Sequence, residues 1–426
     1  MIKILDYSKL KEGIFAREEL NINVEDTVKD IISNVSNNGD KALYFYAEKF
    51  DKCLLKNLVV TEQEFEKAFL LVEDEFIEIL KRASENIKAF HSKQVRQGFE
   101  IKKENGVIIG QKITPIEKVG LYVPGGTAVY PSTVLMDSIP AKIAGCKEIC
   151  ITTPPNSQGE INPNILVAAK IAGVDKVYKV GGAQAIAALA YGTETIGKVD
   201  KIVGPGNAFV AEAKRQVFGR VNIDMIAGPS EILIIADAKS NPKFIAADLL
   251  SQAEHDKMAS AVLVTDSYEL ALKVQKEIEE QLITLPRSEI AKTSIETNGK
   301  IIVADNFEQV INVSNKIAPE HLELMVDNPF DYLEKITNAG SIFMGRYCPE
   351  SLGDYYAGPN HTLPTSGTAR FSSPLSVDDF IKKTQYTYYT EDALKQVYKD
   401  VVYFANKEGL NAHGNSAKVR FEDWYE

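Results

Sequence analysis

Histidine is scarce in this sequence: 426 residues contain five histidines, so imidazole chemistry is confined to few places. Four of them stand near acids or amides, namely His255, His321, His361 and His413. An imidazole titrates near pH 6.5, so it can bind a metal ion or move a proton near neutral pH. These four histidines and their neighbours are therefore the first candidates for a functional site.

The first cluster lies near the end of a predicted helix, residues 242–256, which opens with a good capping residue and a proline. Asp248, Gln252 and His255 fall on one stripe of this helix because residues three and four apart are neighbours. Taken alone, a solvated polar face explains the stripe better than a binding site does.

The second cluster is the pair Glu320 and His321, between a predicted helix (307–317) and an apolar run (322–326). A carboxylate beside an imidazole can do general acid-base work. A capping glutamate followed by a partly buried histidine explains the pair equally well. Both interpretations stay open.

The third cluster, Glu350, Asp354 and His361, stands in a segment without regular periodicity, residues 346–376. Residues 357–376 of this segment contain one charged residue, Arg370. A long, nearly uncharged irregular stretch inside a compact chain is more often a packed functional loop than a linker. Turn residues that satisfy local backbone groups explain the same side chains equally well. A site is therefore one of two open interpretations here.

The fourth cluster is Glu408 and His413 near the C-terminus, where a solvent-exposed histidine is the favoured interpretation.

The four cysteines include no CxxC pair, which argues against a disulfide framework and against a thiolate zinc site. Cys146 and Cys150 flank a predicted strand start and fit small buried residues better than nucleophiles. The sequence therefore favours a reducing compartment.

The elements that must position these clusters change in kind along the chain. Residues 1–110 carry helical periodicity, and short β-branched runs then alternate with Ala-rich helical stretches, as is typical of parallel βαβ units. We predict an α/β protein with two tandem Rossmann-like doubly wound domains, divided into a helical N-terminal region (1–110), a first domain (111–226), a second domain with the candidate site (227–376) and a helical C-terminal tail (377–426). Strands are predicted at 119–123, 148–152, 176–180, 201–203, 231–236, 261–265 and 300–304, and helices at 24–36, 39–50, 62–93, 133–144, 163–172, 183–191, 208–217, 242–256, 268–282 and 307–317.

Composition limits the partners. With 59 acidic and 48 basic residues the formal net charge is −11, which repels phosphate backbones and anionic lipid. The N-terminus lacks the apolar stretch of a signal peptide, and the apolar runs are shorter than the about 18 residues needed to cross a bilayer. We expect a cytoplasmic protein that binds neither nucleic acid nor membranes.

Two glycine turns, 124–126 and 204–207, follow predicted strands, where doubly wound sheets bind their ligands. Neither turn is a GxGxxG motif, so nucleotide binding there would be weak or atypical. Amides at a helix N-terminus can hold a nucleotide without that motif. Simple tight turns explain the glycines equally well.

Together, the motifs resemble the histidinol dehydrogenase family. They run from residue 119 to residue 416, and their combination is specific to that family, whereas the N-terminal region carries no diagnostic motif. The matching stretches are VGLYVPGG (119–126), GPSEILIIAD (228–237), DLLSQAEHD (248–256), APEHLEL (318–324), PESLGDYYAGPNHTLPTSGTARFSSPLSVDDF (349–380) and EGLNAHGNS (408–416).

The resemblance implies one zinc ion per subunit, with Gln252, His255, Asp354 and His413 as ligands. Nitrogen and oxygen donors without thiolate suit a metal that keeps room for a substrate. The resemblance also implies a homodimer in which the C-terminal arm carries His413 to the site of the neighbouring subunit.

The resemblance further implies that His321 is the catalytic acid-base group and that Glu320 assists water activation. The implied reaction is the four-electron oxidation of L-histidinol through L-histidinaldehyde to L-histidine, the last steps of histidine biosynthesis, with two NAD⁺ consumed. The aldehyde would react as its hydrate, without a cysteine adduct. The implied NAD contacts are Tyr122, Gln184 and Asn207, and the implied substrate contacts are Ser230, Gln252, His255, His321, Asp354, Glu408 and His413, with His361 nearby.

Two other classes of protein stay open. A zinc hydrolase could use the same ligands with Glu320 activating water. A zinc-stapled dimer could use them without catalysis, in which case metal removal would unfold the protein rather than silence it.

Overall fold

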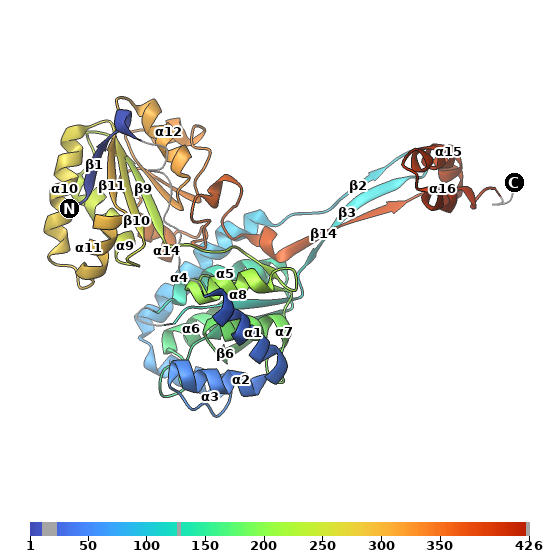
Figure 1. Ribbon diagram of the computed structural model, residues 1–426, viewed down its shortest axis with the longest axis horizontal. Coiled ribbons are helices and arrows are strands. Elements are labelled where there is room, and N and C mark those ends of the chain that lie inside the picture. The colour runs from blue at the N-terminus through green and yellow to red at the C-terminus, as the bar shows by residue number, and fades with distance from the viewer. Residues whose placement is uncertain (11–23, 126–128, 423–426) are drawn as a thin grey trace. The chain divides into compact units, whose positions relative to one another are not determined.

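The computed structural model describes residues 1–10, 24–125 and 129–422, which divide into two compact units. The first unit comprises Met1–Val95 and Ile116–Phe380, and the second comprises Arg96–Pro115 and Ile381–Glu426. The first unit contains two parallel sheets with helices on both faces (Figure 1). This mixed α/β fold agrees with the predicted fold class, and the strands and helices predicted between 119 and 317 are present with bounds shifted by less than one helical turn.

The first sheet has the strand order β6-β5-β4-β7-β8. Successive side chains of a strand point to opposite faces, so Leu121 packs with α3, α4, α5 and α6, whereas Tyr122 packs with α1, α2, α7 and α8. Both faces are therefore buried, as expected for a parallel sheet. The strands are β4 (Lys118–Tyr122), β5 (Glu148–Thr153), β6 (Lys176–Lys179), β7 (Lys201–Val203) and β8 (Asn222–Ile223). The helices are α1 (Glu25–Asn38), α2 (Asp40–Tyr46), α3 (Glu62–Leu71), α4 (Asp74–His91), α5 (Pro131–Ala144), α6 (Pro163–Ala172), α7 (Gly182–Tyr191) and α8 (Ala208–Val217).

The second sheet has the strand order β1-β11-β10-β9-β12-β13. Ile234 of β9 packs with α9, α10 and α11 on one face, and Ile235 packs with α12 on the other. The strands are β1 (Lys3–Asp6), β9 (Glu231–Ala236), β10 (Ser260–Thr265), β11 (Lys300–Val303), β12 (His321–Met325) and β13 (Ser341–Met344). The helices are α9 (Pro242–Ala253), α10 (Tyr268–Leu282), α11 (Ser288–Thr297), α12 (Phe307–Ile317), α13 (Phe330–Leu333) and α14 (Glu350–Tyr355).

The second unit corrects the prediction of a purely helical C-terminal tail (377–426). It contains an antiparallel sheet of order β14-β3-β2, built from β2 (Phe99–Lys102), β3 (Ile108–Pro115) and β14 (Ile381–Tyr388), followed by α15 (Glu391–Lys407) and α16 (Asn411–Lys418). Nearly every side chain of β14 is exposed. A strand exposed on both faces has no apolar alternation, so its sequence carried no strand signal.

The N-terminal region (1–110) was predicted as helical, and this is wrong for β1, β2 and the start of β3. β1 pairs in parallel with β11, so that Lys3 lies opposite Lys300. A four-residue strand whose partner lies far along the chain has no local turn or hairpin signal. The helices of this region are present, although one stretch predicted as continuous is divided into α3 and α4.

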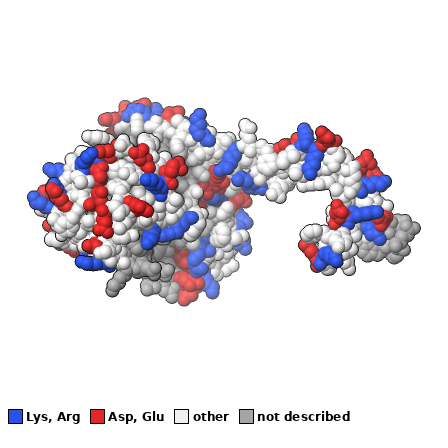
Figure 2. Space-filling model, turned by 90° about the horizontal axis from the view of Figure 1, so that it is seen from above, with Lys and Arg blue, Asp and Glu red and all other residues white. Residues whose placement is uncertain are grey.

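Within the described ranges, no helix has both the length and the apolar character that crossing a membrane requires. On the face shown in Figure 2, acidic and basic side chains are interspersed, so no broad basic surface is visible there. A phosphate backbone would find no continuous attraction on that face.

Asp137 is a buried acid in the middle of α5. Its side chain is fully buried, Oδ1 accepts a hydrogen bond from the Thr362 hydroxyl at 2.8 Å, and Oδ2 has no hydrogen-bond partner. Burial raises the pKa of Asp137 to about 8, although the bond from Thr362 opposes the shift. The folded protein therefore keeps this carboxyl protonated at neutral pH.

The raised pKa of Asp137 predicts a loss of stability with rising pH. The folded protein holds the proton up to about pH 8, whereas an unfolded chain releases it near the ordinary value of 3.8. Between these values each pH unit costs up to about 1.4 kcal/mol of unfolding free energy. The free energy of unfolding, measured with urea between about pH 5 and pH 8, should therefore fall less steeply with rising pH for Asp137→Asn than for the unaltered protein. Equal slopes would contradict the assignment.

Candidate metal and acid-base site

The candidate site lies at the amino end of β12, next to the start of β9. His321 opens β12 and lies opposite Ile232 of β9 and Ser341 of β13. With neighbouring strands on both sides, its side chain is 4% exposed. Glu320, the residue before it, is also buried. The parallel pairing of the strands thus places the predicted acid-base pair inside the protein.

Hydrogen bonding decides which ring nitrogen of His321 carries the proton. Nδ1 lies 2.9 Å from the backbone oxygen of Glu231, and a carbonyl only accepts, so Nδ1 is the donor. Nε2 is buried and has no hydrogen-bond partner. Burial lowers the pKa of His321. The ring is therefore neutral at neutral pH, with an unshared lone pair at Nε2.

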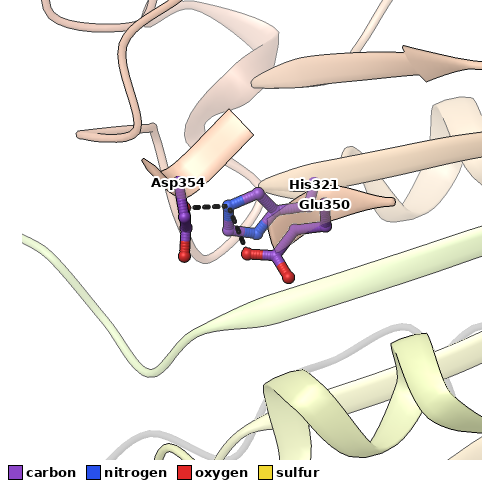
Figure 3. Close-up of side chains that lie close together, drawn as sticks. All are labelled: His321, Glu350 and Asp354. Carbon is purple, nitrogen blue, oxygen red and sulfur yellow. Dashed lines mark ion pairs between the residues drawn. The ribbon is translucent and has the colours of Figure 1, made fainter. Parts of the chain in front are cut away.

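Two carboxylates converge on Nε2 of His321 (Figure 3). Glu350 Oε1 lies 3.8 Å away and Asp354 Oδ1 lies 4.0 Å away. The two acids are four residues apart on α14, so they share one helix face. This helix also corrects the prediction that residues 346–376 are irregular throughout. The candidate ligand atoms of the three residues lie within 4.8 Å of one another.

Glu320 lies on the other side of the His321 ring. Its Oε2 accepts a hydrogen bond from the Glu231 backbone N–H at 2.8 Å and lies 3.7 Å from His321 Nδ1. Glu231 thus orients both residues through its backbone, by donating to Glu320 and accepting from His321. Burial raises the pKa of Glu320 well above its usual range, although the bond from Glu231 opposes this.

The end of α9 lies beside the same carboxylates. Ser251 donates a hydrogen bond to Glu350 Oε2 at 3.3 Å. The next residue, Gln252, is 1% exposed, and its Oε1 is buried without a hydrogen-bond partner. His255 is close enough that its charge lowers the pKa of His321. The candidate ligand atoms that lie within 4.8 Å of one another belong to His321, Glu350 and Asp354. Of the predicted metal ligands His255 and Asp354, Asp354 belongs to this cluster and His255 does not.

His361 approaches the site from the packed segment that follows α14. Its Nδ1 lies 3.7 Å from Asp354 Oδ1 and its Nε2 lies 3.3 Å from the Thr133 hydroxyl. Burial, and to a lesser extent the neighbouring His321, lower the pKa of His361 to about 4. Thr362 and Thr365 are buried as well. The segment is packed, as expected of a loop rather than a linker.

Glu408 and His413 belong to the second unit and are described within it. Glu408 directly follows α15 as its C-cap and His413 lies in α16, and both are exposed. The exposure of His413 agrees with the favoured interpretation of its sequence position. Ser230, the remaining predicted substrate contact, directly precedes β9, and its backbone oxygen accepts a hydrogen bond from Ser260 at 3.0 Å.

The predicted NAD contacts lie at or after the carboxyl ends of three strands of the first sheet. Tyr122 ends β4, Gln184 lies in the first turn of α7 after β6, and Asn207 caps α8 after β7. Tyr122 and Gln184 are buried, and the Tyr122 hydroxyl accepts a hydrogen bond from Gly182 N–H at 3.1 Å. Asn207 is exposed. Of the glycine turn predicted at 124–126, the last residue lies outside the described residues.

Two acids of the site were missing from the predicted site residues. Glu350 is one: it stands in the third candidate cluster of the sequence but was given no role, although its spacing of four from Asp354 places both on one helix face. Glu323 of β12 is the other: it is fully buried, and its Oε1 accepts a hydrogen bond from the Glu350 backbone N–H at 2.7 Å. The sequence feature that could have identified Glu323 is its charge within the mostly apolar run 322–326.

The donor set fits a metal ion. His321 Nε2, Glu350 Oε1 and Gln252 Oε1 are all buried without hydrogen-bond partners. Among the described residues, the recorded ion pairs of Glu350 and Asp354 are with histidines and not with lysine or arginine. Buried polar atoms in proteins are almost always satisfied. A cation would satisfy the two oxygens, and a hydroxyl group held beside it would satisfy His321 Nε2.

Comparisons with known proteins agree with one another. The model of the family described as histidinol dehydrogenase matches residues 16–421. The chain is 59% identical over 419 residues to histidinol dehydrogenase of Clostridium acetobutylicum, covering 98% of this chain and 97% of the relative. It is 57% identical over 420 residues to that of Bacillus cereus, covering 98% and 97%.

A solved structure of histidinol dehydrogenase from Elizabethkingia anophelis superposes with a TM-score of 0.94 at 42% identity, and the match covers 98% of both chains. Sequence and fold therefore agree over almost the full length of the relatives. This chain belongs to the histidinol dehydrogenase family.

Proposed function

We propose that this protein oxidises L-histidinol through L-histidinaldehyde to L-histidine, in a zinc- and NAD-dependent four-electron reaction that ends histidine biosynthesis. One observation carries the proposal: the unshared lone pair of His321 Nε2 is buried beside Glu350 and Asp354, in a chain of this family. A neutral base beside metal-binding oxygens suits removal of a proton from a hydroxyl held by a metal.

Zinc would be held by Gln252, His255 and Asp354, with His413 supplied by a second copy of the chain. The buried, unpartnered Gln252 Oε1 supports this set. When bound, the metal would polarise and orient the amino alcohol as a Lewis acid. Glu350 would remain beside the metal as a further acceptor for the substrate's hydrogen-bond donors.

His321 would serve both oxidations. In the first, Nε2 takes the hydroxyl proton while the hydrogen on the same carbon leaves as hydride to NAD⁺, and the aldehyde forms. Glu320 then assists the addition of water to the aldehyde. After His321 has released the first proton to water, it takes a proton of the hydrate as another hydride leaves to the second NAD⁺. This gives the carboxylic acid, which loses its own proton to water, and a second NADH. The Glu231 carbonyl would stabilise the charged ring by accepting from Nδ1.

NAD would bind at the carboxyl edge of the first, Rossmann-like sheet, at Tyr122, Gln184 and Asn207. The position of all three residues at or after the carboxyl ends of strands of one parallel sheet supports this assignment. The substrate would contact Ser230 and Glu408 besides the metal ligands and His321, with His361 nearby.

A homodimer would complete each site. The second unit exposes large apolar side chains on α15, among them Tyr403 and Phe404, which are 66% and 68% exposed. An exposed apolar patch of this kind is typical of a protein contact.

The protein would act in the cytoplasm. The free cysteines among the described residues fit a reducing compartment.

The reaction itself can be measured by its stoichiometry. We expect two NADH per L-histidinol consumed, and loss of this activity on chelation that is restored by Zn²⁺. A hydrolase would produce no NADH at all. A zinc-stapled, non-catalytic dimer would lose its circular dichroism signal on chelation, whereas the proposed enzyme keeps its fold and loses its rate.

The division of labour between His321 and Glu320 predicts different variant kinetics. His321→Ala should lower the rates of both histidinol and histidinaldehyde oxidation by about 100- to 10,000-fold, because it removes the base of both steps. Glu320→Gln should slow aldehyde oxidation much more than alcohol oxidation. Glu334→Gln, a change at an exposed carboxylate, is the matched control. Equal losses in both half-reactions of Glu320→Gln would refute its assignment to water activation.

Sharing of His413 between subunits can be tested by co-expression. Variants His321→Ala and His413→Ala should each be inactive alone. A mixed dimer would contain one site with both defects and one intact site, so random mixing should restore about a quarter of full activity. If His413 served its own subunit, every site would keep one defect and the mixture would stay inactive.

A further inference from the structure

The helix α5 contains a gap in its hydrogen bonding. Pro140 lies inside this helix and has no N–H, so the carbonyl of Met136, four residues earlier, lacks its helical donor. The side-chain amide of Asn360 fills the gap, because its Nδ2 donates to the Met136 oxygen at 2.6 Å. Asn360 is 4% exposed. A buried carbonyl on α5 is therefore satisfied by a residue of the packed loop after α14.

The other end of the same amide closes a turn around His361. Asn360 Oδ1 accepts a hydrogen bond from the Thr362 backbone N–H at 2.8 Å. This side-chain bond to the backbone two residues ahead holds the residue between them in a fixed turn. The Thr362 hydroxyl in turn donates to Asp137 at 2.8 Å. The turn is thus fastened to α5 on both sides of His361.

The fastened turn aims His361 at the candidate site. Its two ring nitrogens lie 3.7 Å from Asp354 Oδ1 and 3.3 Å from the Thr133 hydroxyl. Asp354 also lies 4.0 Å from His321 Nε2. The side chain of His361 therefore has polar partners on two sides, while its backbone is fixed by Asn360.

We propose that Asn360 is a positioning residue: anchored on the carbonyl that Pro140 leaves free, it holds His361 in place to bind the amino-alcohol substrate. This inference rests on the proposed function. Pro140 contributes to this arrangement, because it leaves Asn360 as the donor to the Met136 carbonyl, whereas an N–H at position 140 would satisfy that carbonyl within the helix.

The variants Asn360→Ala and Asn360→Ala/Pro140→Ala separate positioning from helix stability. The single change leaves the Met136 carbonyl without a donor and opens the turn. The double change returns an N–H to position 140, so it restores the helix and leaves the turn open. Asn315→Ala is the matched control, because Asn315 also donates to a backbone carbonyl (Lys335, 2.8 Å) and accepts from a backbone N–H (Thr337, 2.8 Å) away from the site.

Three readouts decide the outcome: the urea midpoint, kcat and KM for histidinol, and the rate at which diethyl pyrocarbonate modifies His361, followed by peptide mass spectrometry. In Asn360→Ala we expect a lower midpoint, a KM for histidinol raised at least about tenfold, and faster modification of His361. In the double variant the midpoint should recover while KM and His361 reactivity do not. Asn315→Ala should lower the midpoint only.

Recovery of all three quantities in the double variant would overturn the proposal, since Asn360 would then serve only the helix. Unchanged KM and unchanged His361 reactivity in Asn360→Ala would overturn it as well. Failure of the unaltered protein to reduce NAD⁺ with histidinol would refute the proposed function instead. The modification rate of His361 would still show whether Asn360 holds that side chain.

Discussion

The hydrogen bond from His321 Nδ1 to the Glu231 carbonyl is the interaction on which the site depends. It joins the amino ends of β12 and β9, fixes the ring tautomer and leaves Nε2 for chemistry. The register of the two strands makes it possible, because His321 lies opposite Ile232, the residue after Glu231. A slip by one residue would turn the imidazole to the other face of the sheet. This hydrogen bond therefore depends on the register of β12 and β9, and it determines which ring nitrogen of His321 can accept a proton.

The same region concentrates acids at a cost to stability. Burial raises the pKa values of Glu320, Glu323 and Asp354 well above the usual range. A core of apolar residues would avoid this penalty. Functional sites commonly depart from the packing rules that the rest of a fold obeys. The apolar layers on both faces of the second sheet offset the cost.

Local sequence patterns predicted the parallel strands and crossover helices between 119 and 317, because β-branched runs and helical periodicity are properties of neighbouring residues. They also singled out Glu320, His321 and Asp354, although spacing alone left their roles open. The arrangement around them was not predictable, since the bond between Asn360 and Met136 joins residues distant in sequence. The exposed strand β14 was not predicted for a related reason. It is held by its pairing with β3, a segment distant in sequence, and it has no apolar face that would reveal a strand.

The edge strand β1 affects how the chain is made. β1 is synthesised before its partner β11, which lies almost 300 residues later in the sequence (Figure 1). The second sheet therefore cannot be completed until most of the protein has emerged, and the early segment must wait unpaired while the first sheet folds. The N-terminal ammonium group then pairs with Glu296 at 2.8 Å. One edge of the second sheet is thus closed by two segments that lie almost 300 residues apart in the sequence.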